Sequence, residues 1–83
     1  MVWTEKDNAL HKTFAFKTFA DAIRFMHISV ADIDRINHHP EWSNIYNRVS
    51  CKLCTHDAGN TITEKDHELA KILDANYLQI VKG

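Results

Sequence analysis

Residues 18–42 read TFADAIRFMHISVADIDRINHHPEW, and they contain the clearest helix of the chain together with its end. Thr18 is a typical helix N-cap, and Asp21 follows three residues later to complete a capping box. The helix is expected to end between Asn37 and Pro40, because the residue before a proline is pushed out of helical geometry. The apolar side chains recur at spacings of four and three and predict a helix packed on a core: Phe19, Ile23, Met26, Val30 and Ile33.

The residues before this helix predict a hairpin from Val2 to Phe16. Asp7 and Asn8 are turn formers, and the second arm carries apolar residues on one face at period two. Lys12 interrupts that face. The apolar positions are Leu10, Phe14 and Phe16.

A second hairpin is predicted from Asn44 to Thr55, with its turn near Asn47. Alternation along its second arm assigns two faces to a strand. The first face holds Val49, Cys51, Leu53 and Thr55, and the second holds Arg48, Ser50, Lys52, Cys54 and His56.

The remaining chain predicts a loop and a second helix. Residues 56–61 contain Gly59 and Asn60 and form the loop, after which Thr63 and Asp66 make a second capping box. Leu69, Leu73, Tyr77 and Ile80 then follow on one helical face. The order ββαββα predicts an α+β fold, in which a four-stranded antiparallel sheet packs two main helices on one face.

Length and composition indicate a single domain spanning residues 1–83. The sequence contains only one proline and two glycines, so it predicts no linker between domains. A chain of this size buries only about 60% of the surface that its unfolded form exposes. Self-association is therefore expected.

Composition also excludes several classes of function. The net charge is −1 and no basic stripe is present, so we expect no nucleic-acid partner. No stretch approaches the roughly 20 apolar residues of a membrane span, so we expect no membrane partner. The first residues do not form a secretory signal. Two cysteines without such a signal suggest reduced thiols and a cytoplasmic protein.

Three histidines stand where the predicted elements meet. His38 and His39 follow the long helix, and His56 follows a strand. Imidazole has an unperturbed pKa of about 6.5, which suits proton donation and acceptance at neutral pH. Three in one cleft would suit general acid–base chemistry without a metal. The alternative is that histidines at a helix end only interact with the helix dipole.

The histidines belong to a longer pattern that resembles the signature of the pterin-4a-carbinolamine dehydratases. That pattern consists of Asp34, His38-His39-Pro40, Tyr46, His56 and Asp66. The flanking residues are also similar, and the resemblance extends from Trp3 through the second helix. Three features depart from the family pattern. The chain begins almost at Trp3, where many members carry another helix. The loop before Asp66 is one residue longer, and Asn37 replaces a common aspartate.

The resemblance implies an enzyme, a carbon–oxygen lyase that removes water from 4a-hydroxytetrahydrobiopterin. The product would be quinonoid dihydrobiopterin, in the recycling of tetrahydrobiopterin. It implies no cofactor and no metal, a pterin substrate as the small-molecule partner, and a homodimer or homotetramer.

The matching positions imply the site residues. His38 and His56 would form the acid–base pair, in an order that the sequence leaves open, and His39 would hold the substrate. Asp66 would orient His56, or would only complete its capping box. Trp42 and Tyr46 could stack on the pterin or simply pack. The substrate-binding residues would be Asn37, His38, His39, Pro40, Trp42, Cys54, Thr55, His56 and Asp57.

Two other classes of function compete with catalysis. Cys51, Cys54 and His56 resemble half of a zinc motif, but residues three apart on a strand face opposite sides. A non-catalytic interaction module of the same fold could dock its long helix, residues 18–37, on a partner. The outer residues of that helix show no second apolar stripe: Arg24, His27, Asp34 and Arg35.

Overall fold

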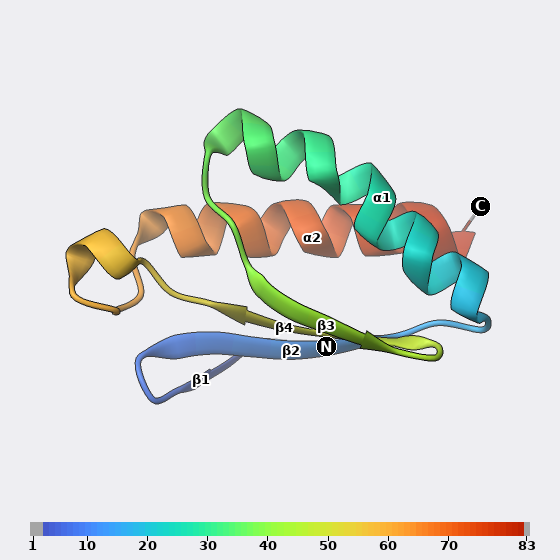
Figure 1. The fold of residues 1–83 in the computed structure, drawn as a ribbon, viewed down its shortest axis with the longest axis horizontal. Coiled ribbons are helices and arrows are strands. Elements are labelled where there is room, and N and C mark those ends of the chain that lie inside the picture. The colour runs from blue at the N-terminus through green and yellow to red at the C-terminus, as the bar shows by residue number, and fades with distance from the viewer. Residues whose placement is uncertain (1–2, 83) are drawn as a thin grey trace.

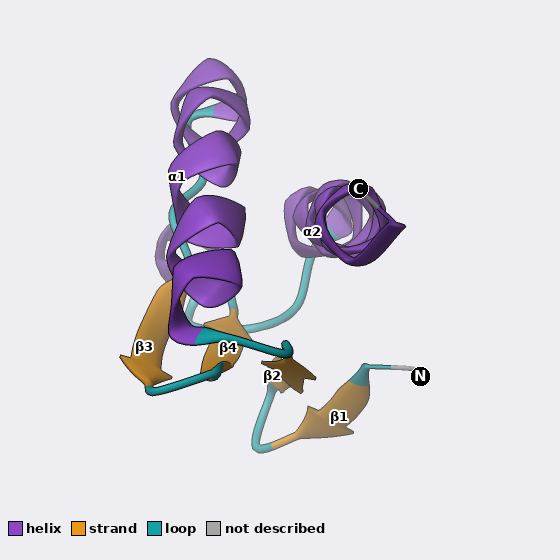
Figure 2. Cartoon of the chain, turned by 90° about the vertical axis from the view of Figure 1, so that its right-hand side faces the viewer, coloured by secondary structure: helices purple, strands orange, loops and turns teal. Residues whose placement is uncertain are grey.

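The computed structural model describes residues 3–82 and confirms the predicted α+β architecture. The chain forms β1 (Thr4–Lys6), β2 (Ala9–Ala15), α1 (Phe19–Ile36), β3 (Glu41–Ile45), β4 (Arg48–Leu53), the short 3-10 helix η1 (His56–Ala58) and α2 (Glu64–Lys82). All strand pairs are antiparallel, in the order β1-β2-β4-β3. Both long helices cover the same face of this sheet (Figures 1 and 2). Val2, the expected start of the first hairpin, lies outside the described residues.

The two hairpins turn where the sequence predicts. Asp7 and Asn8 both have positive φ (52° and 60°), the conformation that tight hairpin turns require. In the second hairpin, β3 begins at Glu41 rather than at the predicted Asn44. The reason is register, because Trp42 is paired with Cys51 of β4 and thereby extends the strand toward Pro40.

The core lies between the sheet and the helices. The predicted faces of β4 and α2 are confirmed, and the fully buried side chains include Phe14, Phe25, Val49, Leu53, Leu69 and Leu73. Lys12 interrupts the core face of β2 as expected, and its side chain is only 7% exposed. Its Nζ donates a hydrogen bond to Oδ1 of Asp74 on α2 at 2.7 Å.

The predicted core face of α1 is wrong in part. Ile33 is buried, but Phe19, Ile23 and Val30 are 51%, 41% and 48% exposed. The helix instead buries the neighbouring face, which is formed by Ala22, Phe25, Ser29 and Ile33. Ser29 is tolerated because its hydroxyl donates to the Phe25 carbonyl (2.8 Å) and accepts from Asn76 Nδ2 (3.0 Å). An apolar stripe therefore faces outward on α1, contrary to the expectation from its charged residues.

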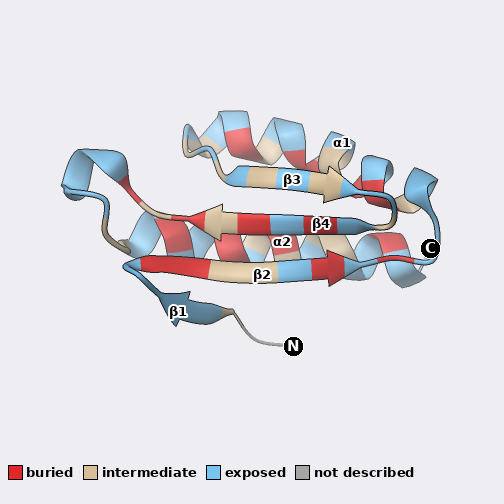
Figure 3. Cartoon of the chain, turned by 60° about the horizontal axis from the view of Figure 1, so that its bottom comes forward, coloured by how far each residue is buried: buried red, intermediate tan, exposed pale blue. Residues whose placement is uncertain are grey.

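The helices leave one face of the sheet uncovered (Figure 3). The end of α1, the end of β4 and the start of α2 meet at one end of the molecule (Figure 1). Within residues 3–82, no helix is both long enough and apolar enough to cross a membrane.

Candidate active site

The end of α1 positions His38 and His39. Asn37 adopts the left-handed conformation (φ 52°, ψ 45°), and its N–H donates to the Asp34 carbonyl at 3.1 Å. The His38 N–H donates to the Ile33 carbonyl at 3.3 Å, which completes a Schellman-type turn. Asparagine is one of the few residues that adopt this conformation readily. The chain therefore leaves the helix abruptly and turns both imidazoles toward the end of β4.

The segment after β4 positions His56. Thr55 is paired with Thr61 across the loop, with a hydrogen bond of 2.9 Å from Thr55 N–H to the Thr61 carbonyl. The predicted loop contains η1, which begins at His56 and ends before Gly59 in the left-handed conformation (φ 83°). This compact loop keeps His56 next to the helix ends.

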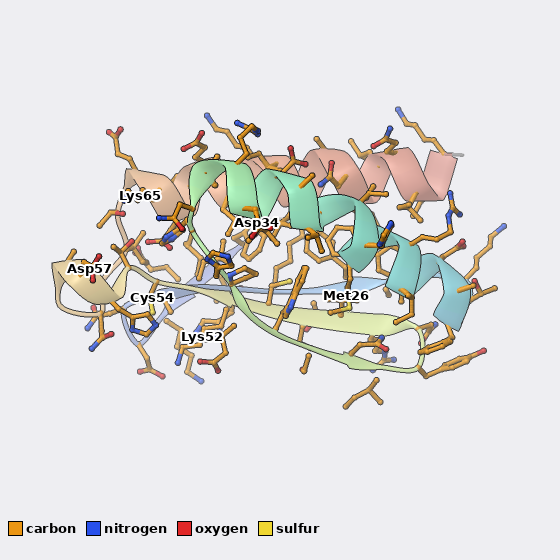
Figure 4. The ribbon with its side chains drawn as sticks, turned by 45° about the horizontal axis from the view of Figure 1, so that its top comes forward. Met26, Asp34, Lys52, Cys54, Asp57 and Lys65 are labelled. Atoms are coloured by element: carbon orange, nitrogen blue, oxygen red, sulfur yellow. The ribbon has the colours of Figure 1, made fainter. Side chains whose placement is uncertain are left out.

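These segments enclose a hollow of about 240 Å³. Figure 4 labels Cys54, Asp57 and Lys65, which come from the end of β4, η1 and the first turn of α2. Seven of the nine predicted substrate-binding residues line the hollow: Asn37, His38, His39, Cys54, Thr55, His56 and Asp57. Pro40 and Trp42 are not among its lining residues.

Lys65 is the lining residue that the sequence analysis missed. Its place directly before Asp66, in the first turn of α2, is the signal that could have indicated it.

The Asp66 side chain forms hydrogen bonds with three other residues at the site. Its side chain is fully buried, and its Oδ1 lies 2.5 Å from His38 Nε2. Oδ2 accepts hydrogen bonds from the Thr55 hydroxyl (2.8 Å) and the Thr63 N–H (2.9 Å). The bond to Thr63 confirms the capping role that the sequence predicted for Asp66. The carboxylate contacts His38, however, and not His56.

The hydrogen bonds also set the charge of Asp66. Burial acts to raise the pKa of this carboxyl group, but hydrogen bonds from His38, Thr63 and Thr55 outweigh burial and hold the pKa below its usual value. An ionised carboxylate can only accept hydrogen bonds, so His38 carries a proton on Nε2. Its Nδ1 is then the ring nitrogen that can exchange a proton with a ligand.

His56 has a different partner. Its Nδ1 lies 2.6 Å from Oδ1 of Asn60, in the same loop. The asparagine carbonyl accepts, so Nδ1 donates and Nε2 is left as the acceptor nitrogen of the neutral ring. The contact between Asp66 and His56 that the sequence suggested is therefore absent. The two imidazoles are oriented separately, one by a buried carboxylate and the other by an exposed amide.

His39 is exposed and pairs with a carboxylate on α1, the helix that precedes it. Its Nε2 lies 3.2 Å from Oδ1 of Asp34, and both side chains are at least 60% exposed. Asp34 is thus a local partner of His39. An exposed pair of this kind contributes little to stability, which leaves His39 free to contact a ligand.

The aromatic and cysteine side chains divide between core and surface. Trp42 packs against the core, whereas Tyr46 is 67% exposed at the tip of the second hairpin. Cys51 is buried in the core, and Cys54 lines the hollow. Among the residues that the structure describes, no three His, Cys, Asp or Glu side chains are grouped closely enough to hold a metal ion.

Comparison with known proteins identifies relatives over most of this chain. Residues 1–76 match the family model described as pterin 4 alpha carbinolamine dehydratase. A protein of Opitutus terrae, provisionally named a pterin-4-alpha-carbinolamine dehydratase, is 46% identical over 69 residues, which are 83% of this chain and 71% of that protein. A protein of Solibacter usitatus with the same provisional name is 47% identical over 73 residues, 88% of this chain and 76% of its own length.

Two solved structures share the fold. A transcriptional coactivator/pterin dehydratase from Brucella melitensis superposes with a TM-score of 0.85 at 38% identity, covering 90% of this chain and 81% of the other. A pterin dehydratase-like protein described as a RuBisCO assembly factor in the alpha-carboxysome gives a TM-score of 0.80 at 22% identity, covering 93% and 90%. The second likeness concerns the fold alone. The family-model match and the relatives at 46% and 47% identity show that this chain belongs to the pterin-4a-carbinolamine dehydratase family.

Proposed function

We propose that this protein removes water from 4a-hydroxytetrahydrobiopterin or a closely related 4a-hydroxy-tetrahydropterin. The product is the quinonoid dihydropterin, which a reductase can return to the tetrahydro form. Membership of the family supports the type of reaction. The two cysteines of this protein are not disulfide-bonded, as is usual in the cytoplasm, and we place the reaction there.

One observation carries the proposal, namely the gathering of His38, His39 and His56 around one hollow. The three residues come from two segments that are 17 or more positions apart in the sequence. Structural histidines at a helix end would not require a third imidazole from another element. The buried Asp66 carboxylate behind His38 further supports catalysis, because it fixes the proton on one ring nitrogen.

The chemistry needs one proton donor and one proton acceptor. The lone pair of N5 forms the C4a=N5 double bond while the C4a–O bond breaks, and an imidazolium protonates the departing oxygen to give water. A second imidazole removes the proton from N5, so the total charge of the two histidines is unchanged. Proton exchange with solvent then restores each histidine to its starting form. Acid–base catalysis of this kind contributes about 10²–10⁴-fold. His38 and His56 fill these two roles, and His39 holds the substrate.

Stopped-flow absorbance on freshly generated 4a-hydroxytetrahydrobiopterin tests the proposal. We expect the wild-type protein to accelerate dehydration, and His38→Ala and His56→Ala to lose most of the acceleration. His39→Ala should mainly raise KM. His27→Ala is the matched control, because His27 is an exposed histidine on α1 outside the hollow. A folded wild-type protein that does not accelerate dehydration over the rate in buffer would refute the proposed dehydratase activity.

We also propose that the protein forms a homodimer or homotetramer through α1. Phe19, Ile23 and Val30 form an apolar stripe along one face of α1, and each is 41–51% exposed. Packed antiparallel on a second copy, the stripe would place Phe19 of one copy near Val30 of the other. The same stripe would serve a non-catalytic module that binds a partner helix, which is the second candidate function.

Sedimentation of two matched variants tests the interface. Ile23→Glu should lower the association constant by tenfold or more, whereas Leu78→Glu, at a position 49% exposed on α2, should not. Equal sedimentation of all three proteins would reject α1 as the interface. Normal dehydration rates in a monomeric Ile23→Glu variant would show that the site is complete in one chain.

A further inference from the structure

A second and larger depression adjoins the histidine hollow. It has a volume of about 830 Å³ and lies between the last turns of α1 and the first turns of α2. Its lining residues are Arg35, Glu64, Lys65, His67, Glu68, Lys71 and Ile72. Lys65 lines both this groove and the hollow, so a ligand can extend from one into the other past that side chain. Figure 4 shows Lys65 above Cys54 and Asp57, at the same end of the molecule.

The two depressions differ in what they can hold. The hollow of about 240 Å³ lies below the 300–1,000 Å³ that pockets for drug-sized ligands occupy, so it suits a small ring system. The groove lies within that range. A pterin carries its substituent on C6, at one edge of the bicyclic ring. With the ring among the histidines, a substituent that leaves past Lys65 would lie in the groove.

The groove has more cations than anions. Arg35, Lys65 and Lys71 face Glu64 and Glu68, which leaves one positive charge in excess on a chain whose net charge is −1. Arg35 is engaged with Asp32 at 3.2 Å, an exposed pair that costs little to rearrange. Across residues 3–82, neither Lys65 nor Lys71 forms an ion pair. Two ammonium groups are thus available for an anion on the path out of the hollow.

We infer that this protein prefers pterins whose C6 substituent carries a phosphate or carboxylate group. Lys65 and Lys71 contact the anion, and Arg35 supports it from α1. This inference rests on the proposed function, because it places the pterin ring in the hollow. An exposed ion pair is worth about 1.5- to 5-fold in affinity, so several cations acting together give a preference on the order of tenfold.

Binding measurements on three unreactive probes test the inference independently of catalysis. The probes are 7,8-dihydrobiopterin, whose side chain is neutral, 7,8-dihydroneopterin 3′-phosphate and 7,8-dihydrofolate, whose tail carries carboxylates. We expect at least one anionic probe to bind on the order of tenfold more tightly than the neutral probe at low ionic strength. The advantage should shrink as salt rises above 0.1 M, where the Debye length falls below about 10 Å. The two anionic probes distinguish phosphate from carboxylate.

Three variants locate the effect. Lys71→Gln and Arg35→Gln should each reduce the affinity for the anionic probe about 1.5- to 5-fold and leave the neutral probe unchanged. Arg24→Gln is the matched control, because Arg24 also pairs with an aspartate three residues away on α1, at 3.1 Å. Anionic probes that bind no better than the neutral one would overturn the inference, as would equal losses in Arg24→Gln and Arg35→Gln. Binding of the neutral probe without any dehydratase activity would instead count against the proposed function.

Discussion

Replacing Asp66 by asparagine separates the catalytic role of this residue from its structural role. The carboxylate accepts hydrogen bonds from His38, Thr55 and Thr63, and two of these donors share one oxygen. An amide of the same shape satisfies all three partners in one orientation only. Its oxygen must accept from Thr55 and Thr63, and its NH₂ must then donate to His38 Nε2. His38 would carry its proton on Nδ1, the opposite tautomer from that in the wild-type protein.

The two consequences have different sizes. A hydrogen bond to a charged group contributes about 1.5–3 kcal/mol and one between neutral groups about 0.5–1.5 kcal/mol. Each exchange costs about 1–1.5 kcal/mol, so three of them predict a loss of about 3–4.5 kcal/mol in the free energy of unfolding. A domain with a typical stability of about 5–15 kcal/mol remains folded after such a loss. The rate should fall more sharply, by about 10–100-fold, because His38 loses the tautomer that the Asp66 carboxylate imposes on it.

The pH dependence of stability gives a second signature. The pKa of Asp66 is lower in the folded protein than its unperturbed value of about 3.9, so the ionised form stabilises the fold above that value. This contribution disappears as the pH falls through the folded pKa. The stability difference between wild type and Asp66→Asn should therefore narrow as the pH falls below about pH 4.

Urea unfolding followed by circular dichroism, together with stopped-flow rates, measures both effects. Asp57→Asn is the control for stability, because Asp57 is an exposed carboxylate on the same hollow. Combining Asp66→Asn with His38→Ala should slow the reaction no further than His38→Ala alone. The reasoning is refuted if Asp66→Asn keeps the wild-type rate, or if it slows the reaction equally in both backgrounds.

Three further predictions concern the rest of the fold. Burial raises the pKa of the Cys51 thiol to about 12, against a smaller opposing effect of Lys12, so Ellman's reagent at pH 8 should label Cys54 alone in the folded protein and both cysteines in urea. Asp74→Asn should lower the free energy of unfolding by about 1–3 kcal/mol in urea titrations, since it removes the carboxylate that accepts hydrogen bonds from Lys12 and from the Trp3 indole. Asn37→Gly should unfold at the same urea concentration as wild type, whereas Asn37→Ala should lose about 1 kcal/mol because φ is 52°.

The features predicted correctly are those that local chemistry determines. The turn at Asp7 and Asn8, the N-cap at Thr18 and the end of α1 at Asn37 each follow from residues next to one another. The faces of β4 and α2 follow from simple periodicity, because one side of each element is clearly more apolar than the other. The ends of the predicted elements suggested a group of three histidines, and the resemblance to a family supported it, although His56 belongs to a different element from His38 and His39.

The core face of α1 could not be predicted because this helix is apolar over more than one face. Ile33 has helical spacing with Phe19, Ile23 and Val30, and also with the neighbouring Phe25. The first face is the predicted one, whereas the second, which is buried, contains Ser29. Ser29 becomes acceptable in the core through hydrogen bonds to Phe25 and to Asn76 on α2. The second partner lies 47 positions away, so only the tertiary structure identifies it.

The partner of Asp66 was missed for a related reason, and the correction changes how the site works. The resemblance implied that Asp66 orients His56, ten positions before it, but the carboxylate contacts His38, which is 28 positions away. The Schellman-type turn at Asn37 brings His38 over the first turn of α2, where the capping carboxylate already stands. One aspartate therefore caps a helix and orients an imidazole. Because the hydrogen bonds from Thr55 and Thr63 favour the ionised carboxylate, the bonds that hold the start of α2 together also keep the proton of His38 on Nε2.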